Sequence, residues 1–175
     1  RRQRPILESM PTPDASAPPD ALPRLGAAPR ARSGRRGGAA GTAMPPRVKA
    51  WRTGLVVTTT SDGQALRYLD AGPRSGPVIM LLHGLPTSSY LYRQVVPALT
   101  ARGFRAIVPD LIGFGASAKP VAEANYQFGV QSGRLLALAD ELGLDRFDLV
   151  VHDLGGMVGW ELLSQQPGRV TRLLV

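Results

Sequence analysis

The stretch Val78–Leu82 constrains the fold of this chain more than any other feature, because its five residues are all apolar and end directly at His83 and Gly84. Such a run is typical of a strand covered on both faces, as strands in parallel sheets are. Residues 104–108 and 147–151 predict two further buried strands, separated by segments of helical length. Strands that alternate with helices predict an α/β fold with a mostly parallel sheet and helices on both faces.

Local patterns predict the remaining elements. The segment SDG at 61–63 is a turn sequence that favours a hairpin, Ser88 is the expected N-cap of the helix after it, and Pro97 is expected to bend or divide that helix. The remaining predicted elements are strands at 55–60, 65–70 and 170–175 and helices at 88–102, 126–142 and 154–166. The side chains expected to be buried are Met157, Val158 and Leu162, together with Tyr90 and Trp160, for which lining a pocket is the alternative.

Charge and composition separate the first fifty residues from the rest. Residues 1–50 hold 10 Lys and Arg against 3 Asp and Glu, a balance of +7, while residues 51–175 hold 11 against 10, a balance of +1. The first segment is rich in Arg, Pro, Ala and Gly and has few large apolar residues, so we expect it to be disordered. We therefore predict a tail at 1–50 and one folded domain at 51–175 that does not bind nucleic acid.

Several classes of site and location are not expected from this sequence. The chain has no cysteine, no cluster of metal-ligating residues and no phosphate-binding glycine loop, so we predict neither a metal nor a cofactor. No apolar run is long enough to cross a bilayer, so we expect no membrane association. A cytoplasmic location is expected, with a plastid or mitochondrion as the alternative if residues 1–43 are a transit peptide. The oligomeric state stays open.

Asp153 occupies a turn between a predicted strand and a predicted helix, and Gly155 and Gly156 follow it. A nucleophile elbow is a sharp turn of this kind that lifts one side chain above the sheet. The backbone amide of Leu154 and the positive end of the helix favour an ionised carboxylate there. The alternative is that Asp153 only caps the helix, as aspartates at helix starts often do.

A second strand end supports the catalytic interpretation. The sequence HGLPTS at 83–88 follows the apolar strand and can present the backbone amide of Leu85 to the same crevice. With the amide of Leu154, this makes two donors for a developing oxyanion beside the Asp153 carboxylate. Two donors and one ionised carboxylate are therefore expected to converge at this edge of the sheet, which favours a nucleophile over a helix cap.

Three ordered motifs carry a resemblance to a known family. They are HGLPTSSYLYR at 83–93, PDLIGFGASAKP at 109–120 and VHDLGGMVGWELLSQQPGRV at 151–170. Residues 52–175 resemble the α/β-hydrolase superfamily, in particular the branch of epoxide hydrolases and haloalkane dehalogenases that uses an aspartate nucleophile. The resemblance implies that Asp153 attacks a small-molecule substrate to form an ester, which water activated by a histidine and an acid then hydrolyses. The motif residues that it implies to be structural are His83, Gly84, Pro86, Asp110, Gly113, Gly115, His152, Gly155 and Gly156.

Two departures from the family pattern shape the functional prediction. Dehalogenases of this kind use side chains at the positions of Leu85 and Leu154 to hold the halide, and leucine donates no hydrogen bond. Epoxide hydrolysis is therefore favoured over dehalogenation. Both histidines, His83 and His152, belong to structural motifs, so the catalytic base and acid are expected outside this sequence. We thus predict the first half of a hydrolase domain, truncated before the cap and inactive alone, with a non-catalytic homologue as the alternative.

Overall fold

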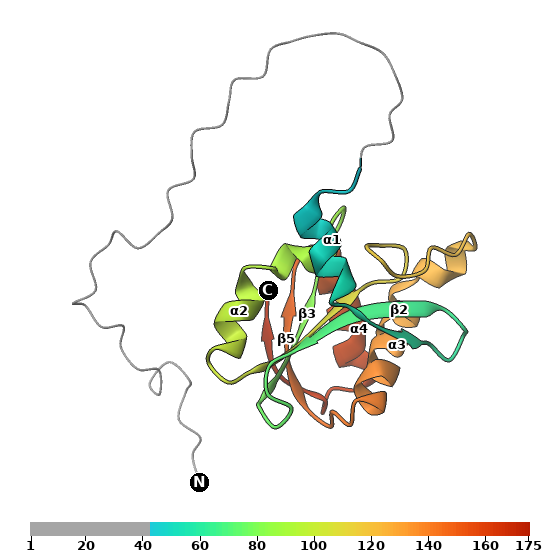
Figure 1. The fold of residues 1–175 in the computed structure, drawn as a ribbon. Coiled ribbons are helices and arrows are strands. Elements are labelled where there is room, and N and C mark those ends of the chain that lie inside the picture. The colour runs from blue at the N-terminus through green and yellow to red at the C-terminus, as the bar shows by residue number, and fades with distance from the viewer. Residues whose placement is uncertain (1–42) are drawn as a thin grey trace, which may run out of the picture. The chain divides into compact units, whose positions relative to one another are not determined.

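The computed structural model describes residues 43–175 (Figure 1). The elements are α1 (Pro46–Thr53), β1 (Val56–Thr59), β2 (Ala65–Ala71), β3 (Val78–Leu82), the 3-10 helix η2 (Ser89–Tyr92), α2 (Val95–Thr100), β4 (Arg105–Asp110), the 3-10 helix η3 (Glu123–Tyr126), α3 (Phe128–Glu141), β5 (Phe147–Val151), α4 (Leu154–Gln165) and β6 (Val170–Leu174). Most of the predicted disordered tail, residues 1–42, lies outside the described residues.

The six strands form one sheet in the order β1-β2-β4-β3-β5-β6. Strands β4, β3, β5 and β6 are parallel to one another, whereas β1 and β2 form the predicted antiparallel hairpin and β2 pairs antiparallel with β4. The mostly parallel sheet predicted from the sequence is therefore confirmed. Its parallel register brings the ends of β3 and β5 side by side, with Leu82 opposite Val151.

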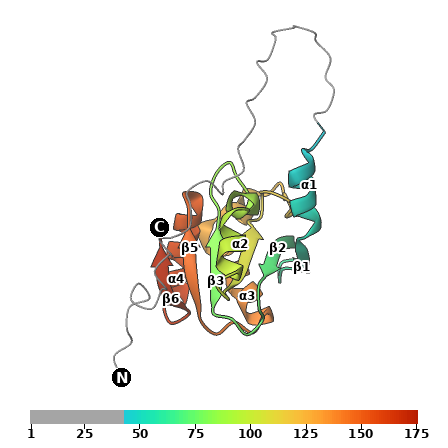
Figure 2. The ribbon, with the colours of Figure 1, turned by 60° about the vertical axis from the view of Figure 1, so that its left-hand side comes forward.

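Helices cover both faces of the sheet (Figures 1 and 2). Successive residues of a buried strand point to opposite faces, so each buried strand needs apolar partners on both sides. Ile79 and Leu81 of β3 pack in one cluster with Val96 of α2. Met80 and Leu82 pack in the other cluster, which holds side chains of α3 and α4. Each face thus has its own apolar core, and the strand ends between them are left at the edge of the sheet.

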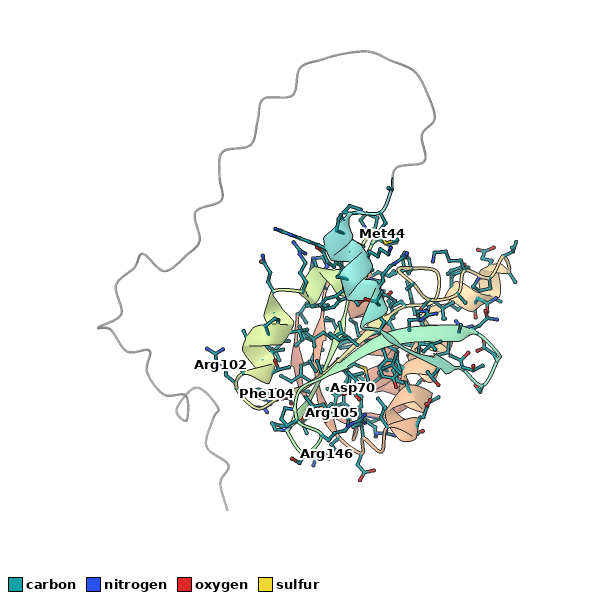
Figure 3. The ribbon with its side chains drawn as sticks, in the orientation of Figure 1. Met44, Asp70, Arg102, Phe104, Arg105 and Arg146 are labelled. Carbon is teal, nitrogen blue, oxygen red and sulfur yellow. The ribbon has the colours of Figure 1, made fainter. Side chains whose placement is uncertain are left out.

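The sheet also contains a buried ion pair at the other end from the predicted site. Arg105 of β4 donates from Nε and Nη2 to the two carboxylate oxygens of Asp70 on β2, at 2.9 and 2.8 Å (Figure 3). This bidentate contact holds the pKa of Asp70 below its ordinary value, because the guanidinium favours the ionised carboxylate. The pair explains how a charged residue fits within a strand of which every residue is buried.

The helix predicted at 88–102 is divided, but the break is not at Pro97. The 3-10 helix η2 ends at Tyr92 and α2 begins at Val95. Pro97 therefore lies in the first turn of α2, where its missing N–H removes no helical hydrogen bond. Ser88 caps η2 as expected, since its side chain accepts from the backbone N of Tyr90.

Two other expectations were wrong. Met157 and Trp160 were expected in the core, but they are 55% and 70% exposed, while Val158 and Leu162 are buried as predicted. Helix α4 presents only the face of residues 155, 158, 159 and 162 to the sheet, and Met157 and Trp160 lie on the opposite face. The boundary placed at residue 50 also fails locally, because residues 46–50 begin helix α1.

Within residues 43–175, none of the helices combines the length and apolar character that a membrane span requires.

Candidate active site

Asp153 lies between the end of β5 and the start of α4, in a backbone conformation that few residues adopt. Its φ of 52° makes it the only non-glycine residue with positive φ among residues 43–175. Positive φ is sparsely populated for residues with a Cβ, and it occurs where the surrounding structure enforces it. The turn raises the exposed carboxylate above the ends of the parallel strands, as expected for a nucleophile elbow.

The Asp153 carboxylate joins two amides that are far apart in the sequence. Its Oδ1 accepts hydrogen bonds from the backbone N of Leu154 at 2.6 Å and from the backbone N of Leu85 at 2.9 Å. The loop that carries Leu85 follows β3, and its Leu85–Pro86 peptide bond is cis. The structure therefore brings together the carboxylate and both predicted donors on one oxygen atom.

This geometry differs from that of an ordinary helix cap. An N-cap side chain usually accepts from the second or third amide of its helix. In α4 those amides belong to Gly155 and Gly156, which instead donate to the carbonyls of His152 and Asp153 at 3.0 and 2.8 Å. Asp153 stands at the N-cap position, but its side chain binds the first helical amide and the distant amide of Leu85.

Two glycines make the close approach of the two loops possible. A Cβ at Gly84 would lie 2.5 Å from Oδ1 of Asp153 and 2.7 Å from the carbonyl oxygen of His152. A Cβ at Gly155 would lie 2.5 Å from the carbonyl oxygen of Leu82. All three distances are too short for real atoms, so the site requires glycine at these positions. Gly156 differs, because its nearest neighbour would be 3.9 Å away.

The two amides also determine the charge of the site. Hydrogen bonds from the backbone N–H groups of Leu154 and, next, Leu85 lower the pKa of Asp153 below its ordinary value of 3.8. Donors to a carboxylate favour its ionised form, so Asp153 is a carboxylate at neutral pH. An ionised carboxylate accepts hydrogen bonds on one oxygen and leaves the other available for a reaction.

His83 connects the oxyanion loop, residues 83–88, to the loop after β4. It is fully buried, and its Nε2 accepts from the backbone N of Leu111 at 3.1 Å while Nδ1 lies 3.1 Å from the carbonyl oxygen of Gly84. Because Nε2 accepts, Nδ1 must carry the proton and donate to Gly84. Burial lowers the pKa of His83, which keeps it neutral. Both ring nitrogens are thus occupied by structural contacts.

A family model described as alpha/beta hydrolase fold matches residues 77–174. The chain belongs to the α/β-hydrolase family.

Haloalkane dehalogenases are among the relatives of this α/β-hydrolase chain. It is 39% identical over 120 residues to a haloalkane dehalogenase of Psychrobacter cryohalolentis, covering 68% of the chain and 40% of that relative. It is 44% identical over 119 residues to a haloalkane dehalogenase of Mycolicibacterium paratuberculosis, covering 67% of the chain and 40% of the relative. The chain thus spans about 40% of the length of these relatives.

Epoxide hydrolases are among the similar solved structures. A mutant epoxide hydrolase of Vigna radiata matches with a TM-score of 0.65 and 37% identity, over 68% of the chain and 36% of that structure. Epoxide Hydrolase A of Mycobacterium thermoresistibile matches with a TM-score of 0.64 and 32% identity, over 68% of the chain and 37% of that structure. These matches place the α/β-hydrolase chain within the epoxide hydrolase and haloalkane dehalogenase branch suggested by its motifs.

Asp110 supports the site of this α/β-hydrolase from below. Its side chain is buried, with Oδ1 accepting from the backbone N of Ser89 at 2.7 Å and Oδ2 from that of Ala116 at 2.6 Å. The glycines of the loop fit this role, since Gly113 and Gly115 have φ of 99° and 53°. A Cβ at Gly115 would collide with the Asp110 carboxylate. Asp110 therefore joins the segments that follow β3 and β4, and it does not face the reacting groups.

His152 is exposed and contributes through its backbone. Its N donates to the carbonyl oxygen of Leu82 at 3.0 Å, which extends the pairing of β3 and β5 up to Asp153. The residues that sequence reasoning missed are Trp51, Arg52 and Ser89, which contact the same loops from α1 and η2. The only signal for them was a tryptophan next to the predicted domain boundary.

Among residues 43–175, no group of three or more His, Cys, Asp or Glu side chains is arranged to hold a metal ion.

Proposed function

We propose that the protein hydrolyses epoxides through a covalent ester on Asp153. The observation that carries this proposal is that the two oxygens of the Asp153 carboxylate differ in their hydrogen bonds. Oδ1 accepts from Leu85 and Leu154, whereas Oδ2 accepts no hydrogen bond within residues 43–175. The two amides orient the carboxylate, and the unoccupied oxygen is free to attack.

In the first step, an electron pair of Oδ2 forms a bond to an epoxide carbon. The bond between this carbon and the ring oxygen breaks, and the ring oxygen takes the electron pair and a proton from an acid. The product is a hydroxyalkyl ester of Asp153. Nucleophilic catalysis of this kind divides one difficult displacement into two easier steps.

In the second step, water adds to Cγ of Asp153 while a base takes its proton. The negative charge develops on Oδ1, the atom that already accepts from the amides of Leu154 and Leu85 at 2.6 and 2.9 Å. Donors in place before the charge appears stabilise it without reorganisation. The intermediate then expels the diol oxygen, which takes a proton, and the carboxylate is regenerated with one oxygen from water.

The leaving group decides between the two substrate classes. A halide leaves as a free anion and needs donors around it, whereas an epoxide oxygen stays attached to the substrate and is neutralised by one proton. Apart from their backbone amides, Leu85 and Leu154 offer only apolar side chains beside Asp153. This favours epoxides.

Haloalkane hydrolysis is the second candidate, because the two curated relatives described above are named haloalkane dehalogenases. The same Asp153 ester serves both reactions, so only the donors around the departing group differ. A substrate panel with equal numbers of terminal epoxides and chloroalkanes distinguishes them by diol formation and chloride release.

Neither histidine is in a position to act as the base in this mechanism. Both ring nitrogens of His83 are occupied, and His152 follows the last residue of β5, where successive side chains point to opposite faces of the sheet, so its ring is expected on the other side from Asp153. We therefore propose that a base and its acid partner come from outside residues 43–175, and that this segment alone does not turn over.

A larger domain would also explain the exposed surface of β6, in which every residue after Val170 is exposed. We propose that residues 51–175, together with the first residues of α1 from Pro46 onward, form part of such a domain. An isolated 43–175 segment is expected to self-associate through this strand edge. A monomer that unfolds cooperatively and resists protease would contradict the proposal.

The test of the proposed chemistry is a single turnover of the full-length protein with an epoxide in water enriched in oxygen-18. Mass spectrometry of the peptide that contains Asp153 is expected to show one heavy oxygen in its carboxylate. Asp153→Asn is expected to lower turnover by about 10⁴-fold or more, as loss of a catalytic nucleophile does. Product formation without label in Asp153 rules out the ester, and a folded full-length protein that turns over neither substrate class indicates a non-catalytic homologue.

A further inference from the structure

Helix α1 has few stabilising features of its own, namely a proline at its first position and Arg52 in its last turn. It has eight residues, no side-chain cap at its start, no acidic residue in its first turn and no fully buried residue. Helices this short are marginal in water, so tertiary contacts must hold α1 in place. Those contacts indicate what the helix does.

Trp51 attaches α1 to the segment that follows the oxyanion loop. Its Nε1 donates to Oγ of Ser89 at 2.9 Å, and its ring meets that of Tyr90 edge to face with centroids 6.0 Å apart. The ring also packs against the apolar cluster formed by β3, β4 and α2. The guanidinium of Arg93 covers the Tyr90 ring, 4.6 Å from its centroid. A hydrogen bond and aromatic packing therefore dock the helix on η2.

Arg52 attaches the same helix to the second loop of the site. Its Nη2 donates to the carbonyl oxygen of Gly115, in the loop that wraps around Asp110. Trp51 and Arg52, which are adjacent in α1, thus contact the two segments that Asp110 joins. Ser89 belongs to both sets of contacts, because its backbone N donates to Asp110 and its Oγ accepts from Trp51.

Ser89 lies four residues after Leu85, the first of the two oxyanion donors. A tight turn fills the interval, in which the backbone N and Oγ1 of Thr87 both donate to the carbonyl oxygen of Gly84, at 2.9 and 2.8 Å. A displacement of η2 is therefore expected to shift the Leu85 amide through this turn. Leu85 itself is 51% exposed.

We propose that α1 is a clasp that positions the oxyanion loop, with Trp51 and Arg52 as positioning residues. The inference rests on the proposed function, in which the Leu85 amide stabilises the oxyanion. Residues of α1 touch no reacting atom in this arrangement. They act through Ser89 and Gly115 on the placement of one amide.

Hydrogen exchange tests the clasp without substrate. The full-length protein and its Trp51→Phe variant are compared by NMR, since phenylalanine keeps an aromatic ring beside Tyr90 but lacks the N–H donor. Exchange of the Leu85 amide is expected to accelerate roughly fivefold, the factor for one lost hydrogen bond, while that of Leu154 stays unchanged. Lys49→Gln, an exposed position on the same helix, is the matched control. Unchanged exchange at Leu85 overturns the proposal, even if Asp153 is shown to form the ester.

Kinetics supplies a readout that a merely structural role would not move. In Trp51→Phe, kcat and KM are expected to fall together by roughly tenfold while kcat/KM stays within about twofold, and a larger fraction of the protein is expected to carry the ester at steady state. Ester accumulates because the oxyanion forms in the second step. Ser89→Ala is expected to have the same effect, and the double variant to be no worse than either single variant. A fall in kcat without ester accumulation contradicts the clasp, whereas absence of any ester in the parent protein contradicts the proposed function instead.

Discussion

The two amides that meet at Asp153 come from segments that are held in different ways. The elbow, residues 151–156, is held by backbone packing, with Gly155 against the carbonyl of Leu82. The oxyanion loop is held by side chains: that of His83 reaches out of the loop to the amide of Leu111, and those of Asp110 and Trp51 bind Ser89, which directly follows the loop. Backbone contacts have no freedom to adjust, whereas side-chain contacts can be removed one at a time. We therefore expect a single substitution to disrupt the elbow as a whole, whereas the removal of one side-chain contact should displace the oxyanion loop only in part.

The largest effect is expected at the elbow. Gly155→Val places a Cβ 2.5 Å from the carbonyl oxygen of Leu82 and 2.8 Å from that of His83. Neither backbone atom can move without separating α4 from β3, so we expect a loss of about 4 kcal/mol or no folded protein. The measurement is chemical denaturation of the full-length protein.

Gly156→Ala is the matched control for the elbow variant. A Cβ there meets nothing closer than 3.9 Å, and alanine favours the helix over glycine by about 0.5–1 kcal/mol. Unfolding free energies that are alike for the two variants would show that the elbow does not depend on close packing at Gly155.

A smaller effect is expected when one support of the oxyanion loop is removed. Asp110→Ala leaves the backbone amides of Ser89 and Ala116 without their buried acceptor, which costs about 2–3 kcal/mol. We expect the Leu85 amide to exchange faster while the Leu154 amide keeps its protection, as measured by NMR. The exposed Asp145→Ala serves as control. Equal loss of protection at both amides would mean that the two segments move together.

The smallest effect is a dependence of stability on pH that comes from His83. Burial lowers the pKa of His83 in the folded state below the ordinary value of 6.5, so the unfolded chain binds more protons just below that pH. The contribution to stability is complete above pH 6.5 and is lost as the pH falls from 6.5 towards the folded pKa. For Asp153, whose pKa is lowered by its two amides, the corresponding loss lies below 3.8.

Acidification from pH 7 to 5 should therefore speed amide exchange in the oxyanion loop, at Leu85, before it speeds exchange in the elbow, at Leu154. Denaturation midpoints at each pH, with Leu85 and Leu154 exchange as local probes, provide the measurement. His83→Gln is expected to flatten the dependence in this range, because glutamine has no proton to gain. A wild-type stability that does not change between pH 7 and 5 would contradict this account of His83.

Much of the fold could be predicted because its strongest signals are local. The bounds of β3 and β5 agree with the predicted strands, since an apolar stretch of strand length between polar or glycine residues leaves few alternatives. Burial on α4 was predicted only in part. A hydrophobic residue on a helix indicates that some surface will cover it, but Met157 and Trp160 show that periodicity does not say which surface.

By itself, the sequence determined the order of strands and helices, the elbow at Asp153 and the glycines that allow it, because these depend on residues close together in the chain. Only the tertiary structure decided that the amides of Leu85 and Leu154 bind the same oxygen, Oδ1 of Asp153, and that α1 reaches Ser89 and Gly115. The local signals for helix α1 are only Pro46 at its start and Gly54 after its end, and its short length leaves its stability to the contacts of Trp51 and Arg52. Contacts between distant segments depend on how the sheet stacks them, and no local pattern records that arrangement.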